Sequence, residues 1–202
     1  MNVIGLHPDF VTLKLVLPVG ISFFTFQALS YTIDVALGKM RATRSVVDFF
    51  AFISFFPQLV AGPIERATNL LPQFTRQRKF SCDTAMDGLC LIAYGLAKKM
   101  VVADTLAMYV DKAYLTPGFY SSVTCVIAAV FFAMQIYCDF SGYSDAARGF
   151  AKLFGFELMV NFNRPYMAPT FADFWRRWHI SLSSWFKDYV YIPMGGSRCS
   201  KP

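Results

Sequence analysis

The feature that most constrains this chain is the spacing of its charged side chains, which leaves three long stretches without Asp, Glu, Lys or Arg. These stretches cover 15–33, 49–64 and 113–138, and they contain 19, 16 and 26 residues. A helix that crosses the hydrocarbon core of a bilayer needs about 20 mainly apolar residues. The first and third stretches are long enough, and three such runs are more than the core of a soluble domain would explain. The chain is therefore predicted to be an all-α, polytopic membrane protein.

Composition narrows the classes of function. Hydrophobic residues make up 55% of the 202 residues and charged residues 16%, whereas soluble chains average about 45–50% and about 25%. An aromatic share of 17% excludes a disordered chain. Five cysteines without a CxxC pair and two histidines exclude a disulfide framework and a zinc cage, so no metal is expected. The net charge of +6 raises nucleic-acid binding as an alternative, but the charge-free stretches argue against it, and no nucleic-acid partner is expected.

The sequence is assigned to one membrane domain over 1–202. Its predicted segments are a transmembrane helix at 15–36, a re-entrant segment at 49–64, a transmembrane or interfacial helix at 85–110, a transmembrane helix at 121–138, and amphipathic helices at 144–158 and 171–190. The segment 49–64 is read as re-entrant because basic residues flank it on both sides, which is awkward for a true crossing. Helix caps, each a Ser or Thr followed three residues later by Asp, are predicted at Ser45, Thr84 and Thr170.

The helix at 85–110 carries Lys98 and Lys99 in its middle. It crosses the membrane if the lysines face a polar interior, or it lies in the interface with the lysines reaching toward water. A turn follows at 116–118. If this helix crosses outward and 121–138 returns, the outer loop carries only Lys112, and every other basic cluster after the first helix faces the cytoplasm. A multi-pass protein of the cytoplasmic (inner) membrane, surrounded by lipid, is the predicted setting.

A histidine in the last predicted helix is the main catalytic candidate. On a continuous helix over 171–190, His179 shares a face with Trp175 and Ser183, and Arg176 lies to the side, where it could meet an anionic ligand. An ionisable group at membrane depth is a functional candidate, and histidine is a suitable general base near neutral pH. The alternative is a structural histidine within an ordinary belt of interfacial aromatic residues.

Other polar residues have two interpretations each. Asp139, Asp145 and Arg148 could line a substrate path or form a mutually neutralising structural network. The segment 141–145 reads as a turn that separates the apolar span from the amphipathic helix after it. The adjacent pair Glu65 and Arg66 is interpreted as a charge pair at a helix end rather than as part of a site.

Six blocks of sequence carry a resemblance to a known family. They are LPVGISFFTFQ at 17–27, FPQLVAGPI at 56–64, YCDFSGYSD at 137–145, NFNRPY at 161–166, FWRRWHISLS at 174–183 and YIPMGGSR at 191–198. In this order they resemble the membrane-bound O-acyltransferase (MBOAT) family. The resemblance is greatest to the bacterial branch that contains alginate O-acetyltransferase membrane subunits and the D-alanyl transfer protein of teichoic acid modification.

The resemblance implies an activity and its components. An acyl group, here an acetyl group, would pass from a cytoplasmic thioester donor such as acetyl-CoA or an acyl carrier to a hydroxyl of an exopolysaccharide such as alginate. No bound cofactor is implied, and an acyltransferase partner protein outside the membrane would complete delivery. His179 matches one of the two catalytic positions of the family. The residues then expected along the substrate path are Asp139, Tyr143, Trp175, Arg176 and Ser183.

The second catalytic histidine of the family, within a Trp-His-Gly context, has no counterpart in these 202 residues. Helices that the family places before the first block are also missing. On this resemblance the sequence is expected to be a central part of such an enzyme, truncated at both ends. The alternative function is a catalytically incomplete chain, or a non-catalytic membrane scaffold that serves acyl-transfer partners.

Overall fold

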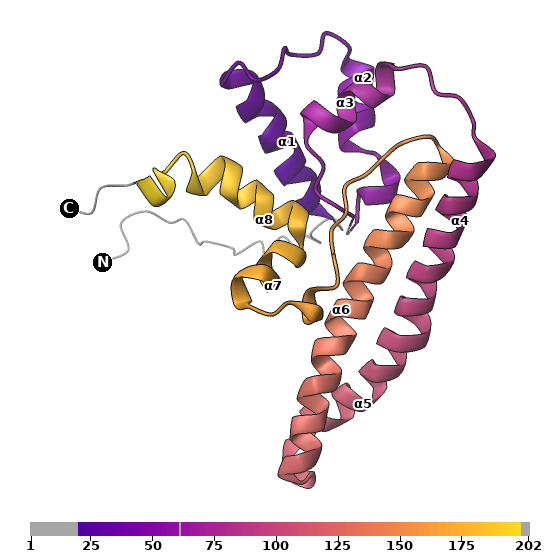
Figure 1. Ribbon diagram of the computed structural model, residues 1–202, viewed down its shortest axis with the longest axis vertical. Helices are drawn as coiled ribbons and strands as arrows, with labels where there is room; N and C mark the ends of the chain where they lie inside the picture. The colour runs from indigo at the N-terminus through magenta and orange to yellow at the C-terminus, as the bar shows by residue number, and fades with distance from the viewer. Residues whose placement is uncertain (1–19, 61, 199–202) are drawn as a thin grey trace, which may run out of the picture.

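The computed structural model describes residues 20–60 and 62–198, and every regular element within these ranges is a helix. The α-helices are α1 (Ile21–Ala36), α2 (Val46–Ile53), α3 (Ala67–Thr75), α4 (Cys82–Leu96), α5 (Asp104–Leu115), α6 (Ser122–Leu153), α7 (Phe171–Arg177) and α8 (Ile180–Phe186). Helices α4, α5 and α6 form a long hairpin, α1, α2 and α3 gather at its upper end, and α7 and α8 project from its side (Figure 1). The all-α prediction is confirmed.

The hairpin consists of two long helical rods. In the first rod, α4 continues through a π-helical segment, η2 (Ala97–Ala103), into α5. A turn at η3 (Pro117–Phe119) leads into the second rod, α6, in the place that the sequence predicted for a turn. Within the described residues, α6 is the one helix with the length and apolar composition to cross a membrane.

Four glycines let the two rods of the hairpin approach closely. A Cβ atom added at Gly95 would lie 2.4 Å from the carbonyl oxygen of Gly142, and one at Gly142 would lie 2.6 Å from that of Gly95. The same reciprocal contact joins Gly88 and Gly149, at 2.8 and 2.5 Å. Within each pair the backbones touch where any side chain would separate them. Small residues of this kind are typical of closely packed helices, above all in membranes.

The helix α6 corrects two predictions. The transmembrane helix at 121–138 and the amphipathic helix at 144–158 are one continuous helix, which ends at Leu153, and the turn expected at 141–145 is wrong. The small residues that suggested a turn are instead buried inside the helix, among them Gly142 and Ser144. The packing of α4 against them outweighs their local preference for a turn.

The helices at the upper end of the hairpin surround a compact apolar core. Phe52, Phe55, Leu70 and Phe156 are buried in it. The predicted cap at Ser45 is confirmed, because its side chain accepts a hydrogen bond from the Asp48 backbone N–H at the start of α2.

Three other predictions for this region change. Ser81, rather than Thr84, caps α4. The segment 49–64 contains the end of α2 and a short 3₁₀ helix, η1 (Phe56–Gln58), while position 61 lies outside the described residues. The part of the predicted helix 15–36 before residue 20 also lies outside them, and the rest corresponds to α1.

The predicted continuous helix over 171–190 is wrong, because the chain breaks between α7 and α8. The cap at Thr170 is confirmed, since its side chain accepts from the Asp173 backbone N–H. At the break, His179 adopts the left-handed backbone conformation with φ 42° and ψ 54°. The Ile180 backbone N–H then donates to the Asn161 carbonyl oxygen at 2.9 Å instead of to its own helix. After α8 the chain continues as a π-helical segment, η5 (Lys187–Tyr191).

Candidate active site around His179

His179 lies at the first position before α8, at the break between α7 and α8. Its ring meets Phe140 of α6 edge to face, with the ring centroids 4.7 Å apart. Phe162 lies on another side, with its centroid at 6.1 Å. A left-handed conformation is uncommon for a residue other than glycine and persists only where the surroundings hold it. The imidazole is thus held in a half-buried aromatic setting by contacts from three segments.

One buried amide holds the histidine ring. The Asn161 side-chain oxygen accepts hydrogen bonds from the Ser181 hydroxyl at 2.9 Å and from the Ser181 backbone N–H at 3.3 Å. The same oxygen lies 3.1 Å from His179 Nδ1. The Asn161 amide nitrogen donates to the Ser144 hydroxyl of α6 at 3.2 Å. All three partners of the histidine network, Asn161, Ser181 and Ser144, are buried.

This network sets the tautomer of the imidazole. The Asn161 oxygen has no hydrogen to give, so Nδ1 must carry the hydrogen to form the bond between them. The lone pair of the ring is then on Nε2, and no hydrogen bond to Nε2 comes from the described residues. Burial lowers the pKa of His179 from 6.5 to about 4. The imidazole is therefore neutral at physiological pH and can accept a proton at Nε2.

A second buried side chain places the segment that carries Asn161. The Glu65 carboxylate, 1% exposed, accepts from the Met159 backbone N–H and from the Asn69 side-chain amide, the latter at 2.7 Å. Burial raises the pKa of Glu65, and these hydrogen bonds oppose the rise. Glu65 and Arg66 lie at the start of α3, and the charge of Arg66 also opposes the rise in the pKa of Glu65, but the ion pair that Arg66 forms is with Asp188. The role of Glu65 is to fasten the chain two residues before Asn161.

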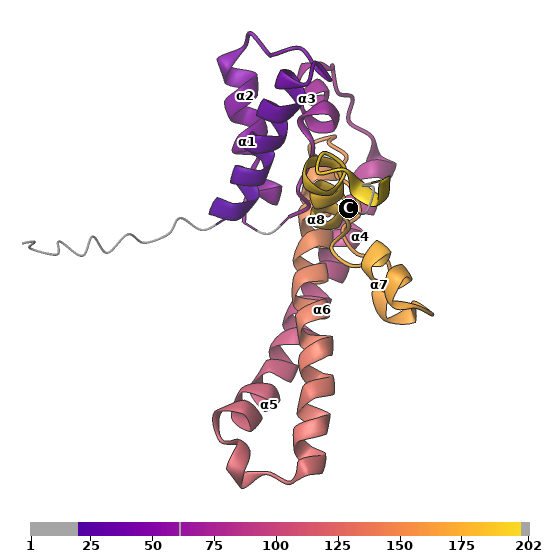
Figure 2. The ribbon, with the colours of Figure 1, turned by 90° about the vertical axis from the view of Figure 1, so that its left-hand side faces the viewer.

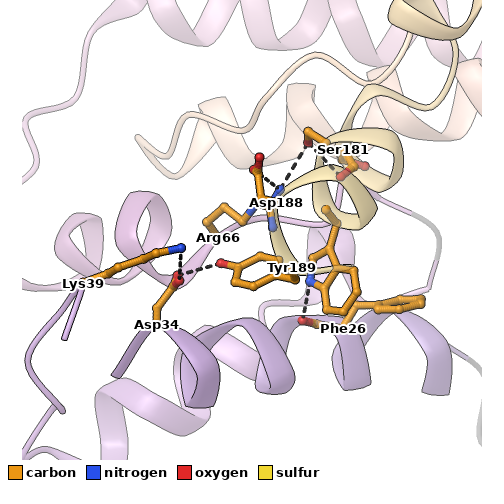
Figure 3. Close-up of polar contacts among 9 residues, drawn as sticks. Phe26, Asp34, Lys39, Arg66, Ser181, Asp188 and Tyr189 are labelled. Carbon is orange, nitrogen blue, oxygen red and sulfur yellow. Dashed lines mark hydrogen bonds and ion pairs between the residues drawn. The ribbon is translucent and has the colours of Figure 1, made fainter. Parts of the chain in front are cut away.

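A group of polar contacts joins the segment after the histidine to α1 and to Arg66 (Figure 3). We call the contacts of Tyr189, Asp188 and Trp185 with these partners the latch. The Tyr189 hydroxyl donates to the buried Asp34 carboxylate at 2.7 Å, and burial together with this bond raises the pKa of Tyr189 to about 12. Arg66 pairs with Asp188 at 3.0 Å and lies over the Tyr189 ring, 4.6 Å from its centroid. The Trp185 ring N–H donates to the Phe26 carbonyl oxygen at 3.1 Å. The latch fixes α8 against α1.

Two of the predicted path residues lie on the hairpin and do not contact His179. Asp139 pairs with Lys99 at 2.6 Å, and half of its side-chain surface is exposed. Tyr143 lines an apolar hollow of about 250 Å³ with Phe56 and Phe150. Phe140, between these two residues in the sequence, is the one that contacts the histidine.

The path residues predicted on α7 and α8 are also spread out. Trp175 is 58% exposed and contacts Phe174 edge to face. Arg176 is exposed, whereas the neighbouring Arg177 pairs with Asp173. The Ser183 backbone N–H bonds the His179 carbonyl oxygen, but its hydroxyl donates to the Trp178 carbonyl oxygen. Because the helix breaks, Trp175 and His179 do not form the shared face that a continuous helix would give.

The charged residues of the hairpin form ion pairs with one another. Lys98 contacts Asp145 at 2.5 Å and the Ser141 hydroxyl at 3.1 Å, and Arg148 contacts Asp145 at 3.2 Å. Lys98 is only 11% exposed at its side chain, so it faces α6 rather than an interface. The polar side chains between α4 and α6 neutralise one another.

The residues that sequence reasoning missed are Asn161, Ser181 and Ser144. Asn161 lies in the irregular segment after α6, outside every helix. One signal was available, since the blocks 161–166 and 174–183 of the resemblance contain Asn161 and Ser181. The sequence did not indicate that these two blocks pair through the backbone, which is what brings Asn161 to His179.

Comparisons with known proteins extend this description. A family profile for MBOAT, the membrane-bound O-acyltransferase family, matches residues 39–202. The chain is 43% identical, over 97% of its length, to a protein of Pseudomonas aeruginosa named probable alginate O-acetylase AlgI. It is 38% identical, over 94% of its length, to a peptidoglycan O-acetyltransferase of Helicobacter pylori. It is 27% identical, over 86% of its length, to a teichoic acid D-alanyltransferase of Bacillus subtilis.

The matched region is a part of each relative. It covers 37% of the Pseudomonas protein, 41% of the Helicobacter protein and 44% of the Bacillus protein. The family profile, by contrast, matches most of the present chain, including the hairpin and the histidine region. The chain belongs to the membrane-bound O-acyltransferase family.

Proposed function

We propose that this chain provides the histidine site of a polytopic O-acyltransferase of the cytoplasmic membrane. The enzyme moves an acetyl group from a cytoplasmic thioester, acetyl-CoA or an acyl carrier, to a hydroxyl of an exopolysaccharide such as alginate. The identity to the alginate O-acetylase, 43%, exceeds that to the D-alanyltransferase, 27%, and this difference supports acetyl transfer to a polysaccharide. An acyltransferase partner protein outside the membrane completes delivery.

The observation that carries the proposal is the bond between His179 Nδ1 and the buried Asn161 oxygen, at 3.1 Å. It leaves Nε2 as the free acceptor of a neutral imidazole. In the proposed step, Nε2 takes the proton from the acceptor hydroxyl while the hydroxyl oxygen forms a bond to the thioester carbonyl carbon. The carbon–sulfur bond then breaks, and the leaving thiolate takes up the proton from the imidazole. General base catalysis of this kind contributes about 10²–10⁴-fold to a rate.

The membrane setting is part of the proposal. The helix α6 has the length and composition to cross a bilayer. The charge-free stretches at 15–33 and 49–64 support further membrane segments, a crossing for the first and a re-entrant path for the second. The ion pairs and glycine contacts between α4 and α6 allow the charged first rod to lie in the membrane beside α6.

The test of the proposal is His179→Ala, with the protein produced from its own gene in its own cell. The O-acetyl ester content of the extracellular polysaccharide is measured, and the amount of protein in the membrane fraction is measured beside it. We expect the ester content to fall to background, while the control Lys187→Gln, an exposed cation on η5, keeps it. Normal acetylation by His179→Ala at a normal protein level would contradict catalysis by His179 and favour the scaffold role.

A further inference from the structure

The upper end of the hairpin contains a hollow region that the histidine site does not use. Three adjoining hollows of about 660, 360 and 240 Å³ share Glu157 in their walls. They lie where the end of α3, the start of α4, the end of α6 and the segment after α6 meet (Figure 1). We call these three spaces together the basic hollow.

Cations from two sides line the basic hollow. Arg76, Arg78 and Lys79 come from the connection between α3 and α4, and Arg148 and Lys152 come from the last turns of α6. Residues distant in the sequence therefore converge on one space. Such a concentration of positive charge raises the local concentration of anions.

Only part of this positive charge is neutralised. Lys152 pairs with Asp87 at 3.3 Å and Arg148 with Asp145 at 3.2 Å. The three cations between α3 and α4 form no ion pair within 20–60 and 62–198. The acidic residue that lines all three hollows is Glu157, which is exposed. Three unpaired cations against this carboxylate leave the basic hollow with an excess of positive charge.

Arg78 is held in place rather than loose on the surface. Its guanidinium donates to the Gln73 carbonyl oxygen at 2.6 Å and lies over the Phe156 ring, 4.3 Å from the centroid. Its side chain also packs on Gly155, whose φ is +73° and where an added Cβ would lie 3.3 Å from Arg78 Cδ. A guanidinium fixed in this way offers its remaining N–H groups to a ligand at a low entropic cost.

Two further features of the basic hollow favour an anion. The start of α4, a helix of 15 residues, contributes Ser81 and Thr84 to the wall, and a helix N-terminus carries a partial positive charge. Asp83 in the first turn of α4 takes up part of that charge. Independently, the Arg148 Nε atom is buried without a hydrogen-bond partner among the described residues. A buried donor that lacks a partner carries a cost in free energy.

We propose that the basic hollow binds a phosphate group. Phosphate oxygens match the fork of a fixed guanidinium, the lysine ammonium groups and a helix N-terminus. The phosphate belongs either to a soluble phosphorylated molecule or to a lipid headgroup at the membrane surface. The proposal does not rest on the proposed acyl transfer, because none of its residues contacts His179.

The basic hollow and the histidine site share one segment of chain. Glu157 bonds Gln73 through both its backbone N–H and its carbonyl oxygen, and four residues later Asn161 holds His179. An extended chain spans at most about 3.6 Å per residue, so the Cα atoms of Glu157 and Asn161 lie within about 14 Å of each other. The basic hollow and the histidine site are therefore joined by a short segment of chain.

The test compares two double variants that remove the same charge. Arg78→Gln with Lys79→Gln changes the basic hollow, and Arg41→Gln with Arg44→Gln removes two exposed cations between α1 and α2. The probes are inorganic pyrophosphate and short-chain phosphatidylglycerol, titrated by calorimetry into the protein in a nonionic detergent. We expect the first variant to lose about tenfold or more in affinity for at least one probe and the control to stay within about twofold.

The pattern of loss identifies the source of the phosphate. Weakened binding of pyrophosphate supports a soluble ligand, and weakened binding of phosphatidylglycerol alone supports a lipid headgroup. Arg78 also packs on Phe156, so its replacement could change the structure as well as the charge. The single variant Lys79→Glu, at an exposed side chain, must therefore also weaken binding of the probe. The proposal is overturned if neither probe binds, if Lys79→Glu binds as tightly as the unchanged protein, or if the control loses as much affinity as the Arg78 and Lys79 variant.

Discussion

The hairpin and the histidine region are stabilised in different ways. In the hairpin, two long helical rods lie side by side (Figure 2). Their backbones touch at Gly88, Gly95, Gly142 and Gly149, and ion pairs join them. In the histidine region the chain is irregular, and buried polar side chains hold the backbone. His179 is one of two non-glycine residues with positive φ among those described.

The comparison shows where each region tolerates change. The hairpin depends on the absence of side chains at a few positions, so an added side chain disrupts it while changes on its outer face do not. The histidine region depends on single polar groups, each of which bonds several partners. Loss of one such group leaves buried donors or acceptors without partners, which is costly even where no volume changes.

The largest effect is expected for Gly95→Leu. Already its Cβ atom would lie 2.4 Å from the Gly142 carbonyl oxygen, so the rods must separate. We expect the free energy of unfolding to fall by about 3 kcal/mol, the upper end of the usual cost of overpacking, measured by thermal or denaturant unfolding in detergent. The control is Gly118→Leu, at a position with no atom within 4 Å of the added Cβ. Equal stability of the two variants would refute the close contact.

Next is Asn161→Ala, which removes the oxygen that holds the imidazole. We expect the rate of the proposed acyl transfer to fall by roughly 10²-fold, because a general base in the wrong tautomer or orientation loses its contribution. Stability is also expected to fall, by about 1–3 kcal/mol, since Ser181 and Ser144 lose their partner. The control is Asn163→Ala on the same segment, an exposed residue. Parallel losses of rate in the two variants would show that Asn161 does not position His179.

The pH dependence of the reaction rate and of stability tests whether the imidazole of the histidine region is buried. Because the pKa of His179 is lowered to about 4, the rate of the proposed acyl transfer is expected to stay constant as the pH falls through 6.5 and to decline only toward pH 4. In the unfolded chain the imidazole of residue 179 takes up a proton near pH 6.5, whereas in the folded protein it does so only near pH 4. The free energy of unfolding is therefore unaffected by this group above about pH 6.5 and decreases as the pH falls from 6.5 toward 4.

A variant tests the cause of this pH dependence. Asn161→Asp places a carboxylate beside the ring and should raise the pKa of His179, so the decline moves to higher pH. Rate profiles between pH 4 and 8 for the unchanged protein and Asn161→Asp provide the measurement. A decline centred near 6.5 in the unchanged protein would mean that the imidazole is not buried as described.

The smallest effect is expected for Tyr189→Phe in the latch. The variant removes the hydroxyl that donates to Asp34, a carboxylate only 2% exposed, and leaves Lys39 at 3.7 Å as its ion partner. Stability should fall by about 1–3 kcal/mol, while Tyr191→Phe, at an exposed ring two residues later, should change little. Unfolding in detergent measures both. If the two variants have the same stability, the latch does not hold α8.

Local sequence signals predicted much of the fold. The caps at Ser45 and Thr170 and the turn at 116–118 are set by residues within a few positions of one another, and all three are present. The prediction of a turn at 141–145 is wrong because small residues such as Gly142 and Ser144 occur in two kinds of structure. In isolation small residues favour a turn, but against another helix they allow close packing, and the partner that decides between these structures lies about 50 residues earlier.

For the candidate site, the sequence indicated the histidine but not the residues that hold it. His179 was identified from its chemistry and from its block of the resemblance. Trp175 and Ser183 are expected to share one face of a continuous helix with His179, and the break between α7 and α8 removes that face. This error comes from the assumption that 171–190 is a continuous helix.

By itself the sequence determined that this chain is helical, that its apolar stretches favour lipid, and that one histidine is a candidate for chemistry. Hydrophobic length and residue chemistry are properties of short stretches, so they can be recognised without a structure. Only the tertiary structure decided where the helix breaks and which amide holds the imidazole. Both depend on the pairing of 161–163 with 177–180, which is formed by backbone groups that every residue carries and that residue identity does not encode.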